Sequence, residues 1–154
     1  MRVELVEAAV DPGALLSAFI AGRRETGAVV SFTGLARADG GETTALELEA
    51  YPGFTEAEIA RIAAAAAERF GLQDALVVHR TGRIAPGEPI VFVAAAAAHR
   101  RAAFEAADHL MDFLKSRAPF WKKRHGPGGE AWIEPSAGDY RDAQRWERQE
   151  TRRP

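Results

Sequence analysis

Apolar and polar residues alternate along several short segments of the chain, which is the pattern of half-buried β-strands. Residues 3–7 and 46–50 alternate with a period of two, whereas residues 27–34, 75–80 and 90–93 are rich in strand-forming side chains. Trp132-Ile133 fits a last short strand. The pattern therefore predicts strands distributed through most of the chain.

Three longer segments place apolar residues three and four positions apart, which is the spacing of an amphipathic helix. They cover about 11–22, 55–71 and 99–118, and the second opens with Thr55 and Glu58 at capping-box spacing. We expect the strand before the third helix to end within an alanine run, and a proline stops that helix. Strands and helices do not alternate strictly, so the prediction is a single mixed α+β domain with about three helices.

The end of the chain has a different composition. The residues after Gly138 are polar, so we divide the chain into a folded domain at 1–138 and a polar, mobile C-terminal tail at 139–154. The 154 residues, 47% of them hydrophobic, suffice for one domain with a core. Because no apolar run reaches the roughly 20 residues that span a bilayer and no signal peptide opens the chain, we expect a cytoplasmic protein.

Charge and cysteine content narrow the possible chemistry. A net charge of −2 gives no general attraction to nucleic acid. The sequence contains no cysteine, which excludes a disulfide, a thiolate metal site, a cysteine nucleophile or a persulfide on this chain. Any sulfur chemistry therefore needs sulfur that another molecule delivers. The four histidines do not cluster with carboxylates, and we expect neither a metal nor a cofactor.

Lysine is restricted to one short segment. All three lysines, Lys115, Lys122 and Lys123, lie in KSRAPFWKKR at 115–124, whereas the other basic residues are arginines. An ammonium group can lose its proton when it is desolvated, but a guanidinium group cannot. The segment is thus a candidate for acid–base chemistry, with a solvated basic face as the alternative.

Two further segments carry basic residues where an anion can bind. One is a strand running into a glycine-containing loop, 32–37, and the other is His99-Arg100-Arg101, where a strand gives way to a helix. A helix from His99 to Lys115 is roughly 24 Å long at 1.5 Å per residue, so its two ends cannot meet around one small molecule. Either the protein has two sites, or a two-fold dimer brings the start of one helix to the end of its mate's.

Five ordered stretches together resemble the large, catalytic subunit of molybdopterin synthase, the MoaE family. They are GAVVSFTGLAR (27–37), LELEAYPGFTE (46–56), VVHRTGRIAPGEPIVFV (77–93), AHRRAAFEA (98–106) and FLKSRAPFWKK (113–123). The resemblance runs from about Gly27 to Glu134. It implies an α/β hammerhead-type α+β fold with a mixed, largely antiparallel sheet. It also implies a sulfurtransferase that converts cyclic pyranopterin monophosphate to molybdopterin in molybdenum cofactor biosynthesis.

The resemblance further implies a protein partner. In this family each large subunit of a homodimer binds a small ubiquitin-like sulfur-carrier subunit, which gives a heterotetramer. The C-terminal Gly-Gly tail of the carrier ends in a thiocarboxylate and enters a pocket of the large subunit. A chain without cysteine is consistent with sulfur delivered in this way.

Carried over position by position, the resemblance implies a set of site residues. The catalytic residues are Lys115 and Lys122, and Phe32 and Met111 form an apolar pocket wall. The substrate contacts are Leu35, Ala36, Arg37, His99, Arg100, Lys122, Lys123 and Arg124. Relatives can carry a basic residue where this chain has Leu35, so a contact there uses the backbone. In the family, the His-Arg pair reaches the pocket from the other protomer.

The two lysines are given provisional roles from their surroundings. We expect Lys115, beside Met111 and Leu114, to be partly desolvated and to act as general acid and base. Lys122 then stabilises negative charge that develops during the reaction. The sequence leaves these two roles interchangeable, and it leaves open the order of the two sulfur transfers.

Two other functions fit the lysine segment. In one, Lys115 is the Schiff-base lysine of a small lyase. In the other, the basic and aromatic residues at 115–124 form the binding patch of a nucleic-acid or adaptor module. The acidic balance of the chain and the short length of the patch argue against nucleic acid.

Overall fold

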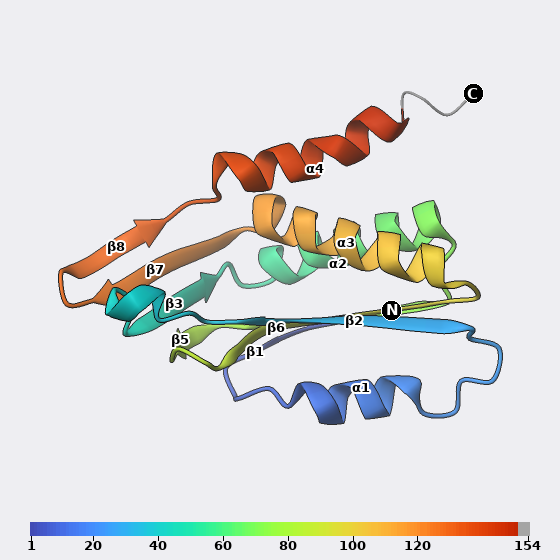
Figure 1. The fold of residues 1–154 in the computed structure, drawn as a ribbon, viewed down its shortest axis with the longest axis horizontal. Coiled ribbons are helices and arrows are strands. Elements are labelled where there is room, and N and C mark those ends of the chain that lie inside the picture. The colour runs from blue at the N-terminus through green and yellow to red at the C-terminus, as the bar shows by residue number, and fades with distance from the viewer. Residues whose placement is uncertain (151–154) are drawn as a thin grey trace.

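The computed structural model describes residues 1–150, and within them it shows two four-stranded sheets and four α-helices (Figure 1). The strands are β1 Arg2–Val6, β2 Ala28–Leu35, β3 Ala45–Ala50, β4 Asp74–Arg80, β5 Gly82–Ile84, β6 Pro89–Ala97, β7 Phe120–Gly126 and β8 Gly129–Ile133. The helices are α1 Pro12–Ile20, α2 Phe54–Phe70, α3 Arg100–Arg117 and α4 Ala137–Glu150, with a short 3-10 helix, η1, at Asp39–Gly41. The predicted α+β class is confirmed, with one α-helix more than expected.

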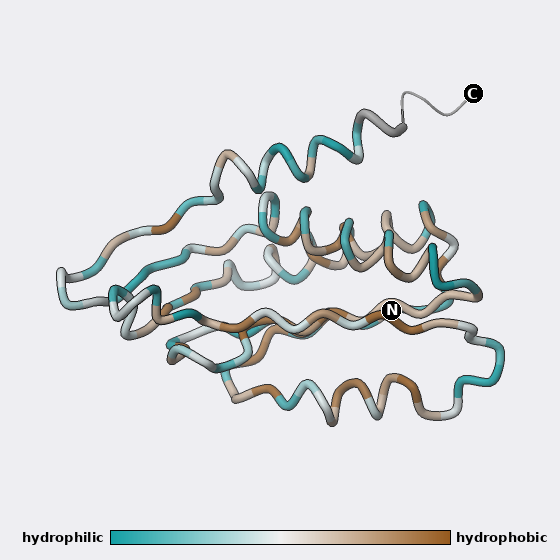
Figure 2. Tube along the Cα trace, viewed as in Figure 1, coloured by the Kyte–Doolittle hydropathy of each residue, from teal (hydrophilic) through white to brown (hydrophobic). Residues whose placement is uncertain are grey.

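The first sheet has the strand order β1-β4-β6-β2, in which β1 is parallel to β4 and the other pairs are antiparallel. α1 covers one face and α2 and α3 cover the other, so that apolar strands lie between two helical layers (Figures 1 and 2). Alternate residues of β6 serve the two faces. Phe92 and Ala94 pack in the cluster that includes α1, whereas Val91 and Val93 pack with α2 and α3. This two-sided burial explains why the alanine run remains a strand as far as Ala97.

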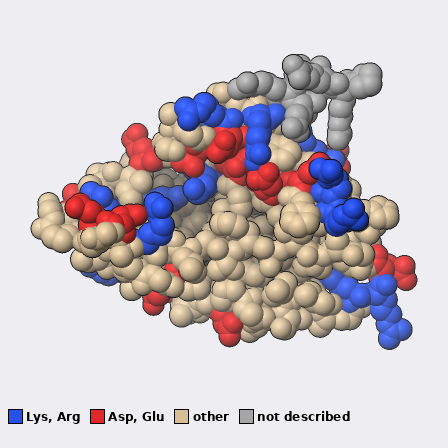
Figure 3. All heavy atoms as spheres, viewed as in Figure 1, with Lys and Arg blue, Asp and Glu red and all other residues tan. Residues whose placement is uncertain are grey.

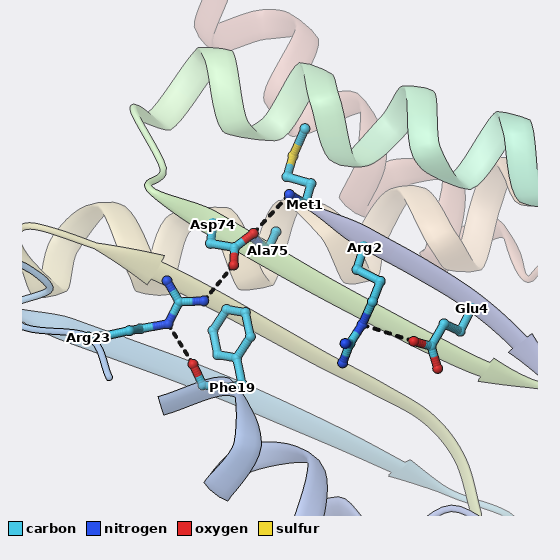
Figure 4. Close-up of polar contacts among 7 residues, drawn as sticks. All are labelled: Met1, Arg2, Glu4, Phe19, Arg23, Asp74 and Ala75. Atoms are coloured by element: carbon cyan, nitrogen blue, oxygen red, sulfur yellow. Dashed lines mark hydrogen bonds and ion pairs between the residues drawn. The ribbon is translucent and has the colours of Figure 1, made fainter. Parts of the chain in front are cut away.

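Charged groups fix the N-terminal strand at the edge of the first sheet. The Met1 ammonium lies 2.9 Å from Asp74 of β4, and Arg23, after α1, lies 2.5 Å from the other oxygen of the same carboxylate (Figure 4). Arg23 also donates to the carbonyl of Phe19 at the end of α1. Burial raises the pKa of Asp74, but the hydrogen bonds from Arg23 and the N-terminus outweigh it and hold that pKa below its usual value. β1, α1 and β4 are thereby joined at one point.

The second sheet has the order β5-β3-β7-β8 and is antiparallel throughout. Its strand β7 follows α3 directly, after a break at Ala118-Pro119. Because side chains alternate along a strand, Lys122 shares a face with its cross-strand partners Leu48 and Ile133, and Lys123 shares the opposite face with Trp132. The register of β7 therefore decides which basic residues face the domain.

The C-terminal residues 137–150 form α4 and pack on α3, so the prediction of a mobile tail from 139 was wrong for these residues. Trp146 is only 4% exposed and donates from its indole nitrogen to Asp112 of α3, 2.7 Å away. Ser136 and Asp139 form reciprocal hydrogen bonds at the helix start, which is a capping-box arrangement. The sequence pattern was weak because few apolar residues in α4 are buried. Residues 151–154 lie outside the described part of the chain.

The predicted capping box of α2 was also wrong. The N-cap is Gly53, whose φ of 75° lies in the left-handed region, and Thr55 is already inside the helix. Glu58 pairs with Arg61 one turn further on instead of reaching back to the cap. Strands β5 and β7 were missed because β5 has three residues and β7 is a basic run without apolar alternation. No helix in residues 1–150 is long and apolar enough to cross a membrane.

Candidate functional site

A cavity of about 280 Å³ lies between the second sheet, the end of α3 and the start of α4. Figure 3 shows this face of the molecule hollowed beside the β7–β8 hairpin, with basic side chains at the hollow. The lining residues are Leu35, Arg37, Asp39, Leu46, Leu48, Ile90, Lys115, Lys122, Ile133, Glu134, Pro135 and Asp139. The strands β2, β3, β6 and β8 supply the apolar part, and ionisable groups from loops, α3, β7 and α4 supply the rest. We call it the lysine cavity.

Both predicted catalytic lysines line this cavity, but their environments differ from the expectation. The side chain of Lys115 is 61% exposed and its Nζ lies 3.4 Å from Asp139. Lys122 is half-buried, and burial lowers its pKa. The positive charge of Lys115 lowers this pKa further, while Asp139 opposes the shift. The desolvated lysine is therefore Lys122, on the strand, because the last turn of α3 leaves Lys115 open to solvent.

The segment Leu35–Arg37 reaches the lysine cavity through an anchored residue. Ala36 is buried, its N–H donates to the carbonyl of Glu88 at 3.0 Å, and its own carbonyl accepts from Gly87 at 2.8 Å. With both backbone groups paired to the segment Gly87–Glu88, Ala36 holds the loop in place. A substrate contact at Ala36 stays a prediction. Leu35 and Arg37 line the cavity on either side of it. Arg37 is 83% exposed and lies 3.3 Å from Asp39.

The basic run on β7 is divided between two faces of the sheet. Lys123 lies on the face opposite Lys122, with its Nζ 3.3 Å from Glu130 and 4.8 Å from the ring centre of Trp132. Arg124 shares the face of Lys122 but does not line the lysine cavity. Within one chain, Lys123 does not line the lysine cavity, because neighbouring strand residues point in opposite directions, and its contact with a substrate stays a prediction.

The other end of α3 forms a separate cavity of about 650 Å³, which we call the arginine cavity. It is lined by Gly27, Ala98, His99, Arg100, Arg101 and Phe104. His99 caps α3 and Arg100 is its first residue, whereas Lys115 is in its last turn, at the other end of the helix. Within one chain, the structure therefore does not bring these two predicted substrate contacts to the lysines, which agrees with the length of the helix.

Phe32 and Met111 also lie elsewhere. They line a third cavity of about 490 Å³, between the edge strand β2 and α3, together with Phe104 and Arg101. Within residues 1–150, β2 pairs only with β6, so this cavity follows an open sheet edge. The expected apolar wall of the lysine cavity is instead supplied by Leu46, Leu48, Ile90 and Ile133.

A family model described as "MoaE protein" matches residues 5–117. The chain belongs to the MoaE family. It is 66% identical over 149 residues to the molybdopterin synthase catalytic subunit of Caulobacter vibrioides, which covers 97% of this chain and 99% of the relative. It is 57% identical over 138 residues to the subunit of the same name from Mesorhizobium japonicum, which covers 88% and 87%.

Solved structures of MoaE proteins share the fold. The molybdopterin biosynthesis MoaE protein of Burkholderia ambifaria superimposes with a TM-score of 0.81 at 39% identity, covering 94% of this chain and 97% of that one. Molybdopterin synthase of Staphylococcus aureus gives a TM-score of 0.77 at 30% identity, covering 84% and 95%. The two-sheet arrangement that forms the lysine cavity thus belongs to an α+β fold found in other MoaE proteins.

Several residues of the lysine cavity were missed by the sequence reasoning. The acidic ones are Asp39, Glu134 and Asp139. Asp139 had a detectable signal, because Ser136 and Asp139 have capping-box spacing and so mark a helix start. In this MoaE protein, the apolar lining of the lysine cavity depends on the register of β3 and β8 against β7. The sequence pattern does not reveal this register. Among the side chains of residues 1–147, no group of three or more His, Asp or Glu is arranged to hold a metal ion.

Proposed function

We propose that this chain is the catalytic subunit of a molybdopterin synthase, which transfers sulfur to cyclic pyranopterin monophosphate and so forms molybdopterin. One observation carries the proposal: in a MoaE fold, two lysines from consecutive elements, α3 and β7, line one cavity with apolar walls. The curated relatives with the same name support it along nearly the full chain. The proposed location is the cytoplasm.

The proposed sulfur donor is a separate protein. With no cysteine in the sequence, the chain has no thiol on which to carry sulfur. A small ubiquitin-like carrier with a C-terminal Gly-Gly thiocarboxylate fits the need, because two glycines make a thin tail that can enter a narrow cavity beside a bound substrate. The proposed assembly is a homodimer of this chain with one carrier on each protomer.

The charges of the lysine cavity suit two anions, the phosphate of the substrate and the thiocarboxylate of the carrier. Arg37 and Lys115 each have a carboxylate neighbour, Asp39 and Asp139. Lys122 has no ion-pair partner among the side chains of residues 1–147. An unpaired, half-buried ammonium group attracts an anion more strongly than a solvated one, because less water screens it.

The proposed roles of the two lysines are the reverse of the first expectation. Lys122, with a lowered pKa, has more neutral amine near neutral pH than an ordinary lysine, and it acts as general acid and base at the carbon under attack. Lys115 supplies fixed positive charge at the cavity mouth. The thiocarboxylate sulfur attacks an oxygen-bearing carbon of the substrate and forms the new carbon–sulfur bond, while the carbon–oxygen bond breaks and the Lys122 ammonium group donates a proton to the leaving oxygen. Water then hydrolyses the acyl–sulfur bond. The carrier leaves as a carboxylate, and the sulfur stays on the pterin.

We further propose that His99 and Arg100 reach the lysine cavity of the partner protomer and bind the substrate phosphate there. Arg100 has no ion-pair partner among the side chains of residues 1–147, so its charge is free for a ligand. Leu35, Arg37 and Arg124 stay in the proposed substrate site. Phe32 and Met111 belong to it only if the dimer brings their cavity next to the lysines. We assign no role to Ala36, whose backbone groups are both paired, or to Lys123, whose side chain points to the opposite face of β7.

Reconstitution tests the function. Purified protein, thiocarboxylated carrier and cyclic pyranopterin monophosphate are mixed, and the dithiolene product is measured. We expect product with the natural chain and none with Lys122→Ala, although both capture the carrier. Carrier capture without any product from the natural chain contradicts the proposal. Steeply salt-dependent binding of oligonucleotides without carrier capture supports the nucleic-acid alternative.

A further inference from the structure

The junction between α3 and β7 lies between the two lysines. Lys115 is in the last turn of α3, and Lys122 is the third residue of β7. The chain leaves the helix at Ala118, which has extended backbone angles, and turns through Pro119 onto the strand. Pro119 has no N–H, and the only backbone hydrogen bond within the turn is from Phe120 to the carbonyl of Ala118. The turn alone therefore does little to fix the strand relative to the helix.

A buried hydroxyl group from another element holds this junction. Thr55, in the first turn of α2, is fully buried, and its Oγ1 donates to the carbonyl of Pro119 at 2.8 Å. The same Oγ1 accepts from the backbone N–H of Tyr51 at 2.8 Å. Tyr51 directly follows β3, which pairs with β7. The hydroxyl group thus links the end of β3, at Tyr51, to the start of β7, at Pro119, in addition to the backbone hydrogen bonds between these two strands.

A buried histidine holds the other side of the junction. The ring of His79, on β4 of the first sheet, stacks on Phe120 with 4.2 Å between centres and 24° between planes. The Nδ1 of His79 lies 2.9 Å from the carbonyl of Arg80, which fixes the ring orientation when Nδ1 carries the proton. Burial lowers the pKa of His79 to about 4, so the ring is neutral at physiological pH. A neutral ring can stack near Lys122 without repelling it.

We propose that Thr55 and His79 are positioning residues for the sulfur transfer: they hold the junction at Ala118–Phe120 and thereby set where Lys122 lies relative to Lys115. The inference rests on the proposed function for its consequence in turnover, but not for its geometry. Neither residue lines the lysine cavity, so each acts through the backbone or ring of the junction.

The position of Lys122 can be measured without the reaction. The groups that share its cavity are Arg37 and Asp39 from the loop, Lys115 from α3, Glu134 after β8 and Asp139 from α4. Burial and the charge of Lys115 both lower the pKa of Lys122. A loosened junction admits water and weakens both effects, so the pKa of Lys122 rises toward that of an ordinary lysine.

The test compares Thr55→Val, which keeps the shape but removes the donor, with Thr55→Ser, which keeps the hydroxyl group. Reductive methylation of Lys122 in the free protein is followed by mass spectrometry as a function of pH, and kcat and KM are measured in the reconstituted reaction. We expect Thr55→Val to move the Lys122 labelling curve to higher pH and to lower kcat about tenfold, with the KM for the carrier unchanged, since a small misplacement of a reacting group is costly. Thr55→Ser keeps both near the natural values.

A stability control separates positioning from general loosening. Ala66→Gly lies in the same helix as Thr55, roughly 16 Å further along at 1.5 Å per residue. It destabilises α2 without touching Pro119, so we expect the natural labelling curve. If Ala66→Gly shifts that curve as much as Thr55→Val does, the proposal is wrong and Thr55 has only a structural role.

His79 gives a second test on a different element, which also serves if Thr55→Val does not fold. His79→Phe keeps a ring to stack on Phe120, and His79→Ala removes it. We expect the labelling curve of Lys122 to shift in the alanine variant and not in the phenylalanine variant. Equal labelling curves in His79→Ala and His79→Phe overturn the stacking part of the proposal.

The outcomes for the proposed function and for the positioning role can be told apart. If the natural chain gives no dithiolene product but Thr55→Val shifts the labelling curve of Lys122, the sulfur transfer is refuted and the positioning role stands. If the natural chain gives product but Thr55→Val changes neither the labelling curve of Lys122 nor kcat, the sulfur transfer stands and the positioning role is refuted.

Discussion

The two ends of α3 carry basic residues in opposite settings. At the C-terminal end, Lys115 faces a cavity that the second sheet and α4 enclose, and Asp139 of α4 is its partner. At the N-terminal end, Arg100 and Arg101 stand in the first turn, and His99 caps the helix without a side-chain hydrogen bond. Cations are favourable at the negative end of a helix and unfavourable at the positive end, by about 0.3–1 kcal/mol each.

This difference bears on the proposal that the two ends of α3 form one site across a dimer, because the chain completes only the lysine end by itself. The lysine end has its walls, its charges and its supports within one protomer. The arginine end places positive charge where the helix disfavours it, beside an open cavity that holds no compensating carboxylate from Arg100's own turn. An arrangement that costs stability within the chain makes sense when another molecule supplies the negative charge, such as a phosphate bound between protomers.

The largest expected effect is at the lysine end. Lys122→Ala should lower the rate of dithiolene formation by about 10²–10⁴-fold, the usual contribution of a general acid or base. Lys122→Arg should be nearly as poor, because a guanidinium group cannot give up its proton. The rate is measured with saturating carrier, after carrier binding has been verified. A fully active Lys122→Arg variant would show that only the positive charge matters.

A mixing experiment tests whether the two ends meet across a dimer. Lys122→Ala and Arg100→Ala should each be poorly active alone. In an equal mixture that exchanges subunits, half of the dimers are mixed and each contains one intact site, so activity should return to about a quarter of the natural value. Verified mixed dimers without recovered activity would place His99 and Arg100 in a separate site.

The lowered pKa of Lys122 also predicts an effect on stability. Because the folded state binds this proton less tightly than the unfolded state, the charged lysine weakens folding below its lowered pKa. The penalty is relieved as pH rises through that value toward about 10.4, the pKa of an unfolded lysine. Lys122→Met should therefore raise the free energy of unfolding at pH 7 by about 0.5–2 kcal/mol while abolishing activity. Urea unfolding at several pH values measures this gain, which should shrink in alkaline solution; a gain that grows with pH contradicts the assigned direction.

The smallest expected effect concerns the neighbouring lysine. Lys123→Ala should change turnover less than about twofold, because its side chain points to the opposite face of β7, where it contacts Glu130 and Trp132 and does not line the lysine cavity. It is the matched control for Lys122→Ala, one residue away on the same strand. A large loss of turnover in Lys123→Ala would mean that the outer face of the second sheet takes part in the reaction.

Much of the fold was predictable because its signals are local. The apolar spacing of α3 and the proline after it gave both ends of that helix, and from its length the separation of His99 from Lys115 followed. The signals failed where tertiary contacts decide. α4 depends on Trp146 packing over α3, and Thr55 caps nothing in its own helix because its hydroxyl group is bonded to Pro119.

The sequence by itself determined the α+β class, the restriction of all lysines to one segment around Pro119 and the resemblance to the MoaE family, which the comparisons confirmed. Only the tertiary structure decided that Lys122 is the desolvated amine, that Lys123 faces away and that Ala36 is an anchor. Spacing and composition are properties of neighbouring residues. Desolvation depends on what covers a side chain, and β3, β8 and α4, which enclose Lys122, meet it only after the chain has folded.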